Sequence, residues 1–110
     1  MDKKKVPPPP EYRALVEALA AQYPDVRTGA MFGMTCLKIH GKAFAGSYAG
    51  GAVFKLAPTE VAAALALPWA EPFDPSGRGA PMRAWAVLPV SLASHWAAFA
   101  ESAIAFVSPV

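Results

Sequence analysis

One cysteine and two histidines are the side chains in this sequence best suited to nucleophilic catalysis or metal binding. Cys36 and His40 are four positions apart, which would bring them together on a helix, but the alternation of residue types around them predicts a strand. Four strand residues span ~13 Å, whereas zinc ligands lie ~2.0 to 2.3 Å from one ion and a general base lies within ~3.2 Å of its nucleophile. The pair therefore forms neither a metal site nor a catalytic couple by itself. His95 is the remaining base that could approach Cys36, and the preferred interpretation is a buried thiol with two ordinary histidines.

Paired carboxylates, which act as general acid and general base in many hydrolases, are not indicated by the acidic residues. The eight acids are spread along the chain, at Asp2, Glu11, Glu17, Asp25, Glu60, Glu71, Asp74 and Glu101. No spacing among them predicts a dyad. We therefore expect a protein that is not an enzyme, with no catalytic residue, no metal ligand and no cofactor.

Glycines and basic residues around position 78 suggest a different chemistry, the binding of an anion. The loop of residues 76 to 79, followed by Arg83, could surround an anion with backbone amides and a guanidinium group. It lacks the order of strand, loop and helix found in phosphate-binding loops, so a flexible hairpin tip is the preferred interpretation. If the fold encloses a pocket for a small ligand or an unrecognised reaction, we expect Lys55, Arg78 and Arg83 to be its anion contacts.

Length and composition predict a single cytoplasmic domain. A chain of 110 residues suits one domain, and much of its 55% hydrophobic content is alanine. The longest uncharged apolar stretch, Val61 to Ala70, is too short for a membrane span, which needs ~20 residues. Prolines 7 to 10 stand where a signal peptide would carry its apolar segment, and one cysteine cannot form an internal disulfide.

The formal net charge of +2 comes entirely from Asp2 and the three lysines Lys3, Lys4 and Lys5. The lysines could give weak, salt-dependent contact with phosphates, but a solvated tail is the preferred interpretation. Sequence-specific nucleic-acid binding is not expected, because the rest of the chain carries no net charge. Four prolines then form a stiff polyproline segment. We expect residues 1 to 10 to be a flexible arm and residues 11 to 110 to be one domain.

Hydrophobic periodicity predicts an α+β fold. The first half of the chain predicts a helix over 11 to 23, an antiparallel meander over 34 to 56, and a short helix opened by Pro58 with Thr59 as its N-cap. The second half predicts an extended segment over 69 to 73, a loop over 74 to 81, a strand over 82 to 88, and a helix from about Ser91. The last helix has one apolar stripe, formed by Leu92, Trp96, Phe99, Ala103 and Phe106. We therefore expect two layers, an antiparallel sheet of about five or six strands with helices on one face.

Short motifs occur in a characteristic succession over roughly Arg27 to Val107. They are Met31-Phe32-Gly33 before a hairpin, Val53-Phe54-Lys55-Leu56, Glu71-Pro72-Phe73, Met82-Arg83-Ala84-Trp85 leading to Leu88-Pro89, and a final helix. This succession resembles the TfoX N-terminal domain family, which commonly has a second glycine where Met34 stands. The resemblance implies a fold like that of secretion chaperones, an association with regulation of bacterial competence, and no known catalytic activity.

These patterns favour a non-catalytic interaction or regulatory domain that binds a protein partner, a second copy of itself first. Gly29 and Gly33 would let Met31 and Phe32 turn into the core, and this reading is preferred over an exposed binding loop. Helices would leave one apolar sheet face uncovered, with Phe44, Tyr48, Val53 and Trp85 on it, and such a face usually marks a contact surface. The candidate binding residues are Met31, Phe32, Gly33, Lys55, Arg78, Arg83 and Trp85.

Overall fold

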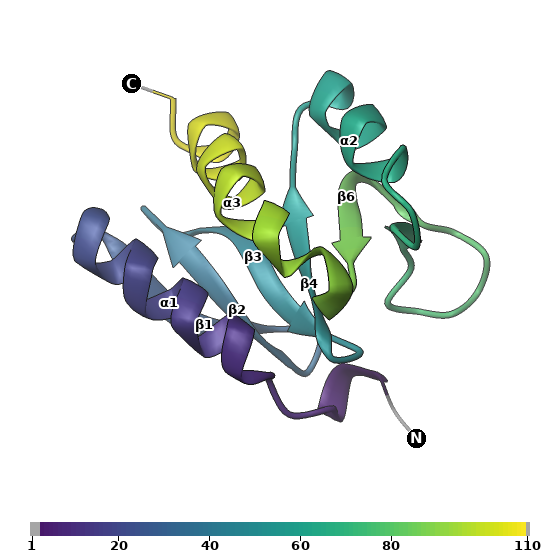
Figure 1. The fold of residues 1–110 in the computed structure, drawn as a ribbon, viewed down its shortest axis with the longest axis horizontal. Helices are drawn as coiled ribbons and strands as arrows, with labels where there is room; N and C mark the ends of the chain where they lie inside the picture. The colour runs from purple at the N-terminus through teal and green to yellow at the C-terminus, as the bar shows by residue number, and fades with distance from the viewer. Residues whose placement is uncertain (1–2, 110) are drawn as a thin grey trace.

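The computed structural model describes residues 3 to 109, except for the side chain of Lys4. Its elements are a 3-10 turn Lys3–Lys5, α1 Pro10–Gln22, β1 Val26–Met31, β2 Met34–Ile39, β3 Lys42–Tyr48, β4 Gly51–Lys55, α2 Pro58–Leu65, β5 Glu71–Phe73, β6 Met82–Leu88, a second 3-10 turn Val90–Leu92, and α3 Ala93–Val107. Within these residues the strands form one antiparallel six-stranded sheet of order β1-β2-β3-β4-β6-β5, with the helices on one face (Figure 1). The predicted α+β layout is confirmed.

Prolines fix where two of the helices begin. Pro10 and Pro58 lie at the first positions of α1 and α2, where a proline loses no hydrogen bond and its fixed φ already suits a helix. An N-cap at Thr59 would start the helix at Glu60, so α2 begins two residues earlier than predicted, with Ala57 as its N-cap, and the prediction that Thr59 caps it is wrong.

The helix α3 is the central covering element of the sheet. Trp96, Ala100 and Ala103 are buried on its inner side, whereas Phe106, which we expected on the buried stripe, is 40% exposed. By length and composition the segment Val90–Val107 could also cross a membrane. It is not an uncharged stretch, because Glu101 lies within it. In this fold its inner side instead packs against β3 and β4.

Tight turns connect the first four strands. The turns Phe32–Gly33, His40–Gly41 and Ala49–Gly50 have positive φ at both residues, 51° to 56° at the first and 79° at the second, as in type I′ turns, whose twist matches that of the flanking strands. The strand β1, which opens this series, was not predicted: we expected Gly29 and Gly33 to let Met31 and Phe32 turn into the core, but these residues lie in the β1–β2 hairpin.

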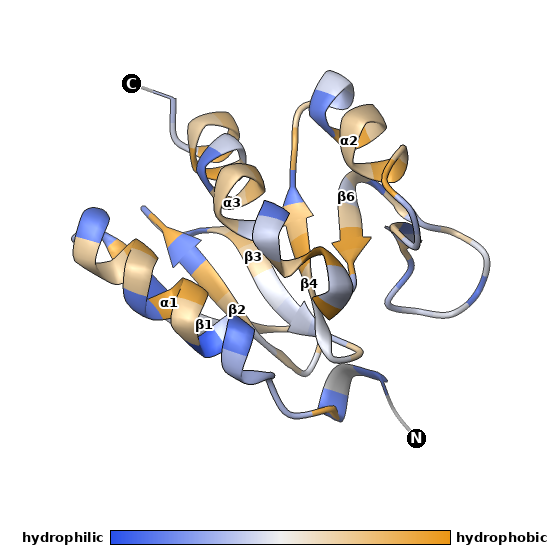
Figure 2. Ribbon diagram, viewed as in Figure 1, coloured by the Kyte–Doolittle hydropathy of each residue, from blue (hydrophilic) through white to orange (hydrophobic). Residues whose placement is uncertain are grey.

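Apolar side chains are buried on both faces of the sheet. On the helix-covered face the core includes Leu37, Phe54 and Leu88. The opposite face carries a second cluster, Met34, Val53, Phe73, Trp85 and Val87, whose members are 0 to 8% exposed. The central strands β4 and β6 are accordingly mainly orange in Figure 2, as expected for strands buried on both faces.

The second cluster is buried because the sheet coils until its edges approach each other. A flat sheet of six strands would hold its edges ~24 Å apart. Here Phe73 of the edge strand β5 lies with its ring centroid 6.3 Å from that of Phe32, at the end of the other edge strand. The expectation of an uncovered apolar face is therefore wrong for Val53 and Trp85.

A register shift separates two residues that we expected on one face. The pairing of β2 with β3 is irregular after Leu37, whose partner is Ala45, while the partner of Lys38 is Ala43. Phe44 lies in this bulge and joins the helix-covered core, whereas Tyr48 packs against the second cluster. A bulge of one residue reverses the faces of a strand, and the period-2 pattern gives no sign of it.

The proline-rich segment follows the surface of the domain. The Ala49 N–H donates a hydrogen bond to the Lys3 carbonyl at 2.9 Å, and the Arg13 guanidinium donates one to the Pro8 carbonyl at 2.9 Å. The segment thus lies against the β3–β4 turn, and α1 begins at Pro10, one residue before the predicted domain boundary. Residues 1 and 2 lie outside the described residues.

Deletion of residues 1 to 9 should leave a folded domain. The deletion removes the hydrogen bonds that Lys3 and Pro8 accept from Ala49 and Arg13, and also the Pro9 carbonyl at the start of α1. A neutral hydrogen bond contributes about 1 kcal/mol, so the free energy of unfolding should fall by about 1 to 3 kcal/mol. Urea unfolding of the two proteins measures the difference. An unfolded or insoluble truncated chain would show that the segment belongs to the fold.

Replacement of Trp85 by alanine should destabilise the fold by ~3 to 5 kcal/mol, because it empties a buried site in the second cluster. The matched control is Trp69→Ala, since Trp69 is 81% exposed and surface changes usually alter stability by no more than ~0.5 kcal/mol. Urea unfolding should separate the two variants. Equal stability of both would contradict the burial of Trp85.

Candidate functional site

Four aromatic rings gather where the edges of the described sheet meet. Phe73 is fully buried, and its ring centroid lies 5.0 Å from Tyr48, 5.8 Å from Trp85 and 6.3 Å from Phe32. Such pairs contribute ~0.5 to 1.5 kcal/mol each beyond simple burial. Phe73 therefore connects two of the predicted binding residues, Phe32 and Trp85; it belongs to the motif Glu71-Pro72-Phe73 but was not among the predicted binding residues.

Phe32 forms the exposed rim of this aromatic cluster. It is 48% exposed and has φ of 51°, a conformation that bulky residues rarely adopt. The preference for core packing is thus wrong for Phe32, because a two-residue turn leaves its side chain at the tip of the hairpin.

Met31 is half-buried and packs against the second cluster. Gly33 has φ of 79°, and a Cβ there would meet no atom within 4 Å, so its backbone conformation and not space favours glycine.

The loop of residues 74 to 81 is organised around a carboxylate of the chain itself. Asp74 accepts hydrogen bonds from the Ser76 hydroxyl at 2.8 Å and from the Gly77 and Gly79 amides at 3.1 and 2.8 Å. The Ser76 hydroxyl, followed by the backbone amides, lowers the pKa of Asp74 below its ordinary value. Asp74 therefore takes the place of the external anion that we considered for this loop.

A hollow of about 350 Å³ lies between this loop and the aromatic cluster. Its lining includes Tyr48 and carries both charges, on Lys3, Glu71 and Asp74. The volume is within the range of ~300 to 1,000 Å³ found for ligand sites. The hollow is therefore a polar concave feature beside the aromatic cluster, with Tyr48 in common between the two.

The structure does not bring the three predicted anion contacts into one pocket. Arg83 lines a separate apolar hollow of about 340 Å³ with Val61 and Phe106. Arg78 is exposed on the loop, and Lys55 is paired across the sheet with Trp85. The expectation that these three residues contact one anion therefore stays a prediction.

A Ser-His-Asp array lies elsewhere and was missed by sequence reasoning. His40 Nδ1 is 2.6 Å from Ser108 Oγ, and His40 Nε2 is 3.0 Å from Asp25 Oδ2. Residues 68 positions apart give no local signal of such contact. The array has the residue types of a hydrolase triad, but Ser108 follows the C-terminal end of α3, where the negative end of the helix dipole opposes a developing oxyanion. The array is therefore better suited to a structural role, in which hydrogen bonds hold the segments around Asp25, His40 and Ser108 together, than to catalysis.

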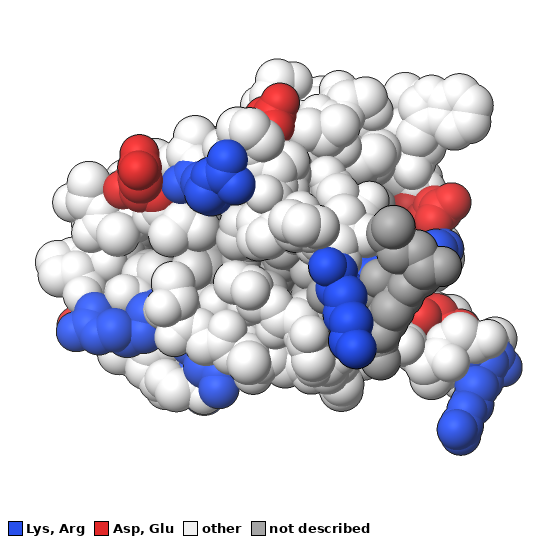
Figure 3. Space-filling view, turned by 90° about the horizontal axis from the view of Figure 1, so that it is seen from below, with Lys and Arg blue, Asp and Glu red and all other residues white. Residues whose placement is uncertain are grey.

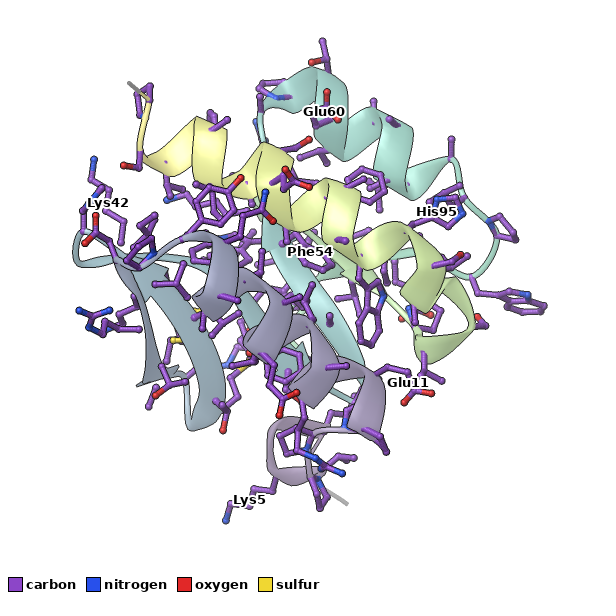
Figure 4. The ribbon with its side chains drawn as sticks, turned by 60° about the vertical axis from the view of Figure 1, so that its left-hand side comes forward. Lys5, Glu11, Lys42, Phe54, Glu60 and His95 are labelled. Carbon is purple, nitrogen blue, oxygen red and sulfur yellow. The ribbon has the colours of Figure 1, made fainter. Side chains whose placement is uncertain are left out.

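The Cys36 thiol forms no hydrogen bond with either histidine among the described residues. Cys36 is completely buried, and burial raises the pKa of its thiol, which makes it a poor nucleophile at neutral pH. His95 is exposed and lies near the start of α3, on the side turned toward α2 (Figure 4). Among residues 3 to 109, no three His, Cys, Asp or Glu side chains are placed to hold one metal ion.

Charged side chains are dispersed on the face shown in Figure 3. Basic groups there are scattered, and some lie beside acidic groups, whereas nucleic-acid readers usually present a continuous basic face. Comparisons of the chain with protein-family models, with curated proteins and with solved structures found no match. The resemblance to the TfoX N-terminal domain family stays a prediction.

The Gly77 and Gly79 amide resonances should titrate with a midpoint below that of an ordinary aspartate, since Asp74 is more acidic in the folded chain. A lowered pKa means that the carboxylate stabilises the loop above the unfolded-state pKa and that this stabilisation is lost as the pH falls through the folded-state pKa. NMR titration measures the midpoint. Asp74→Asn should abolish the titration and Glu71→Gln should not. A midpoint at or above the ordinary value contradicts the arrangement.

Proposed function

We propose that this protein is a non-catalytic protein-interaction domain with a regulatory role, anchored by aromatic side chains at its surface. The observation that carries the proposal is that two exposed aromatic residues stand on left-handed backbone. Phe32 is 48% exposed with φ of 51°, and Trp69 is 81% exposed with φ of 71°.

Stability alone does not account for aromatic residues at these positions. A non-glycine residue in the left-handed region costs of order 1 to 2 kcal/mol, and asparagine or glycine would fit the first position of a type I′ turn better. Tryptophan and phenylalanine are enriched in protein interfaces, and tryptophan is frequent among residues that dominate binding energy. Strained residues that persist against such a cost cluster at functional sites.

The packing around Phe32 prepares it for binding. One side of its ring rests on the aromatic cluster through Phe73, while the remainder faces solvent. A side chain held in one orientation before binding loses less entropy on association. The resemblance to the TfoX N-terminal domain family supports a regulatory role in bacteria, linked to competence, in the cytoplasm.

Binding of a small ligand in the hollow beside Tyr48 is the second candidate function. The observation that favours it is the pairing of an aromatic ring with groups of both charges, Lys3 and Asp74 among them, in one concave site. A ligand that carries an amino and an acidic group would match this lining. Titration of the protein with amino acids, followed by NMR shifts at Tyr48, tests the candidate, and unchanged spectra would contradict it.

Replacement of either aromatic anchor by asparagine should preserve the fold and reduce partner binding. Trp69→Asn should raise the free energy of unfolding by about 1 kcal/mol because it relieves backbone strain. Phe32→Asn should be nearly neutral, because a similar relief offsets the loss of an aromatic pair of ~0.5 to 1.5 kcal/mol. Urea unfolding measures both effects.

The binding test compares proteins from the native host that are retained by each immobilised variant. Proteins held by the natural chain should be lost from Phe32→Asn and Trp69→Asn. They should be kept by the control Phe106→Asn, which changes an aromatic side chain of 40% exposure on a regular helix. Equal retention by all variants would show that the anchors have no part in binding.

A further inference from the structure

The two edge strands of the sheet differ in how well they are protected against pairing. β5 has three residues, includes Pro72 and has a register shift against β6, all of which are features that discourage strand addition. β1 has six residues, Val26–Met31, contains no proline and pairs with β2 without a shift. Its middle residues, Thr28, Gly29 and Ala30, are small and uncharged.

Alternation along β1 identifies the backbone groups that face outward. Met31 and Met34 flank a two-residue turn and therefore exchange both hydrogen bonds of their pair, and residues of an antiparallel strand alternate from there. Arg27, Gly29 and Met31 thus bond to β2. Consistent with this alternation, the Val26 N–H is turned away from β2 and donates to the Tyr23 carbonyl at 3.1 Å.

Thr28 and Ala30 consequently present their N–H and C=O groups at the outer edge of β1. Both residues are exposed, and within residues 3 to 109 no hydrogen bond to these outer groups is present. In Figure 4 the β1–β2 hairpin forms the left margin of the molecule, with no described element beyond it. The edge is open for a further strand.

We propose that β1 is a self-association site, at which a second copy of this chain adds its own β1 in antiparallel register about Gly29. The inference rests on the proposed function, protein interaction, and names the partner. It forms one continuous sheet across both copies through an isologous contact.

The backbone pattern is self-complementary in this register. Thr28 faces Ala30 of the second copy and Ala30 faces its Thr28, so that the outward groups of both residues are paired in both chains. Gly29 faces its own counterpart at the axis, in a pair without hydrogen bonds. Such pairs have the closest Cα approach, ~4.5 Å, and glycine brings no side chain to it.

The side chains are compatible with the same register. Arg27 faces Met31 of the second copy, so the two Arg27 residues are not opposed, and its guanidinium is held by the carbonyls of Pro24 and Val26. Phe32 of one copy comes beside Val26 of the other, and because Val26 is buried in its own core, the exposed part of the Phe32 ring stays accessible. The contact strip is smaller than a standard interface of ~800 Å² per partner, so we expect a weak and concentration-dependent dimer.

Sedimentation velocity over a wide concentration range tests the proposal with the full chain. The natural protein should dimerise as its concentration rises, and so should the control Ala30→Ser, which keeps the N–H group. Ala30→Pro removes an outward N–H without removing a bond to β2, and it should stay monomeric while circular dichroism shows a folded chain. A natural protein that remains monomeric at high micromolar concentration, or an Ala30→Pro variant that dimerises equally well, would overturn the proposal.

Hydrogen exchange of the natural protein gives a second readout that does not depend on the folding of a variant. Exchange at Thr28 and Ala30 should slow as the concentration rises, whereas Gly29 and Met31, already bonded to β2, should be protected at every concentration. Exchange at Thr28 and Ala30 that is independent of concentration in a dimerising sample would place the contact elsewhere and overturn the proposal. Either failure leaves the partner-capture test of Phe32 and Trp69 unaffected, so the two proposals can fail separately.

Discussion

Burial of the sheet face opposite the helices is the constraint on which the rest of this structure depends. The helices cover one face, and a chain of this length buries somewhat over ~60% of the surface that its unfolded form exposes. The second cluster around Trp85 must therefore be covered by the sheet itself. Coiling achieves this, because it brings Phe73 of one edge to Phe32 near the other, and this meeting of edges creates both the aromatic cluster and the hollow beside it.

The turns that coil the sheet also determine what the surface displays. Successive two-residue turns of positive φ match the right-handed twist of strands, so each hairpin adds to the curvature. Their first positions are occupied here by Phe32, His40 and Ala49, none of which is the asparagine or aspartate that such turns favour. Phe32 contacts the aromatic cluster and His40 contacts Ser108, so both side chains form tertiary contacts from positions that local preference would give to other residues.

The sequence was sufficient for those elements whose apolar residues repeat regularly. The helices α1 and α3 and the strands from β2 to β4 follow their periodicity closely. β1 was missed because Arg27, Thr28, Gly29 and Ala30 lack apolar alternation, and this composition reflects an edge position. The bulge at Phe44 and the contact between His40 and Ser108 were also missed, because each depends on pairing between distant segments. Phe32 and Trp85 were among the predicted binding residues, but the aromatic cluster that joins them was not predicted, because the meeting of edges is a property of the whole sheet.

Coiling of the sheet leaves its two edge strands, β1 and β5, in different surroundings, and this difference links the fold to its proposed role. β5 has its side chain Phe73 in the closure of the second cluster, and its Pro72 and short length limit further pairing. β1 contributes little to either core, since Val26 is its one fully buried residue, so its sequence is free to serve contacts outside the chain. The core does not need this edge, yet β1 keeps regular strand geometry at Thr28 and Ala30. Such an edge is costly to leave unprotected, because open edges promote aggregation. Its retention is most simply explained if the edge is covered when the protein acts, and Phe32 at the end of the same strand places an aromatic anchor beside it.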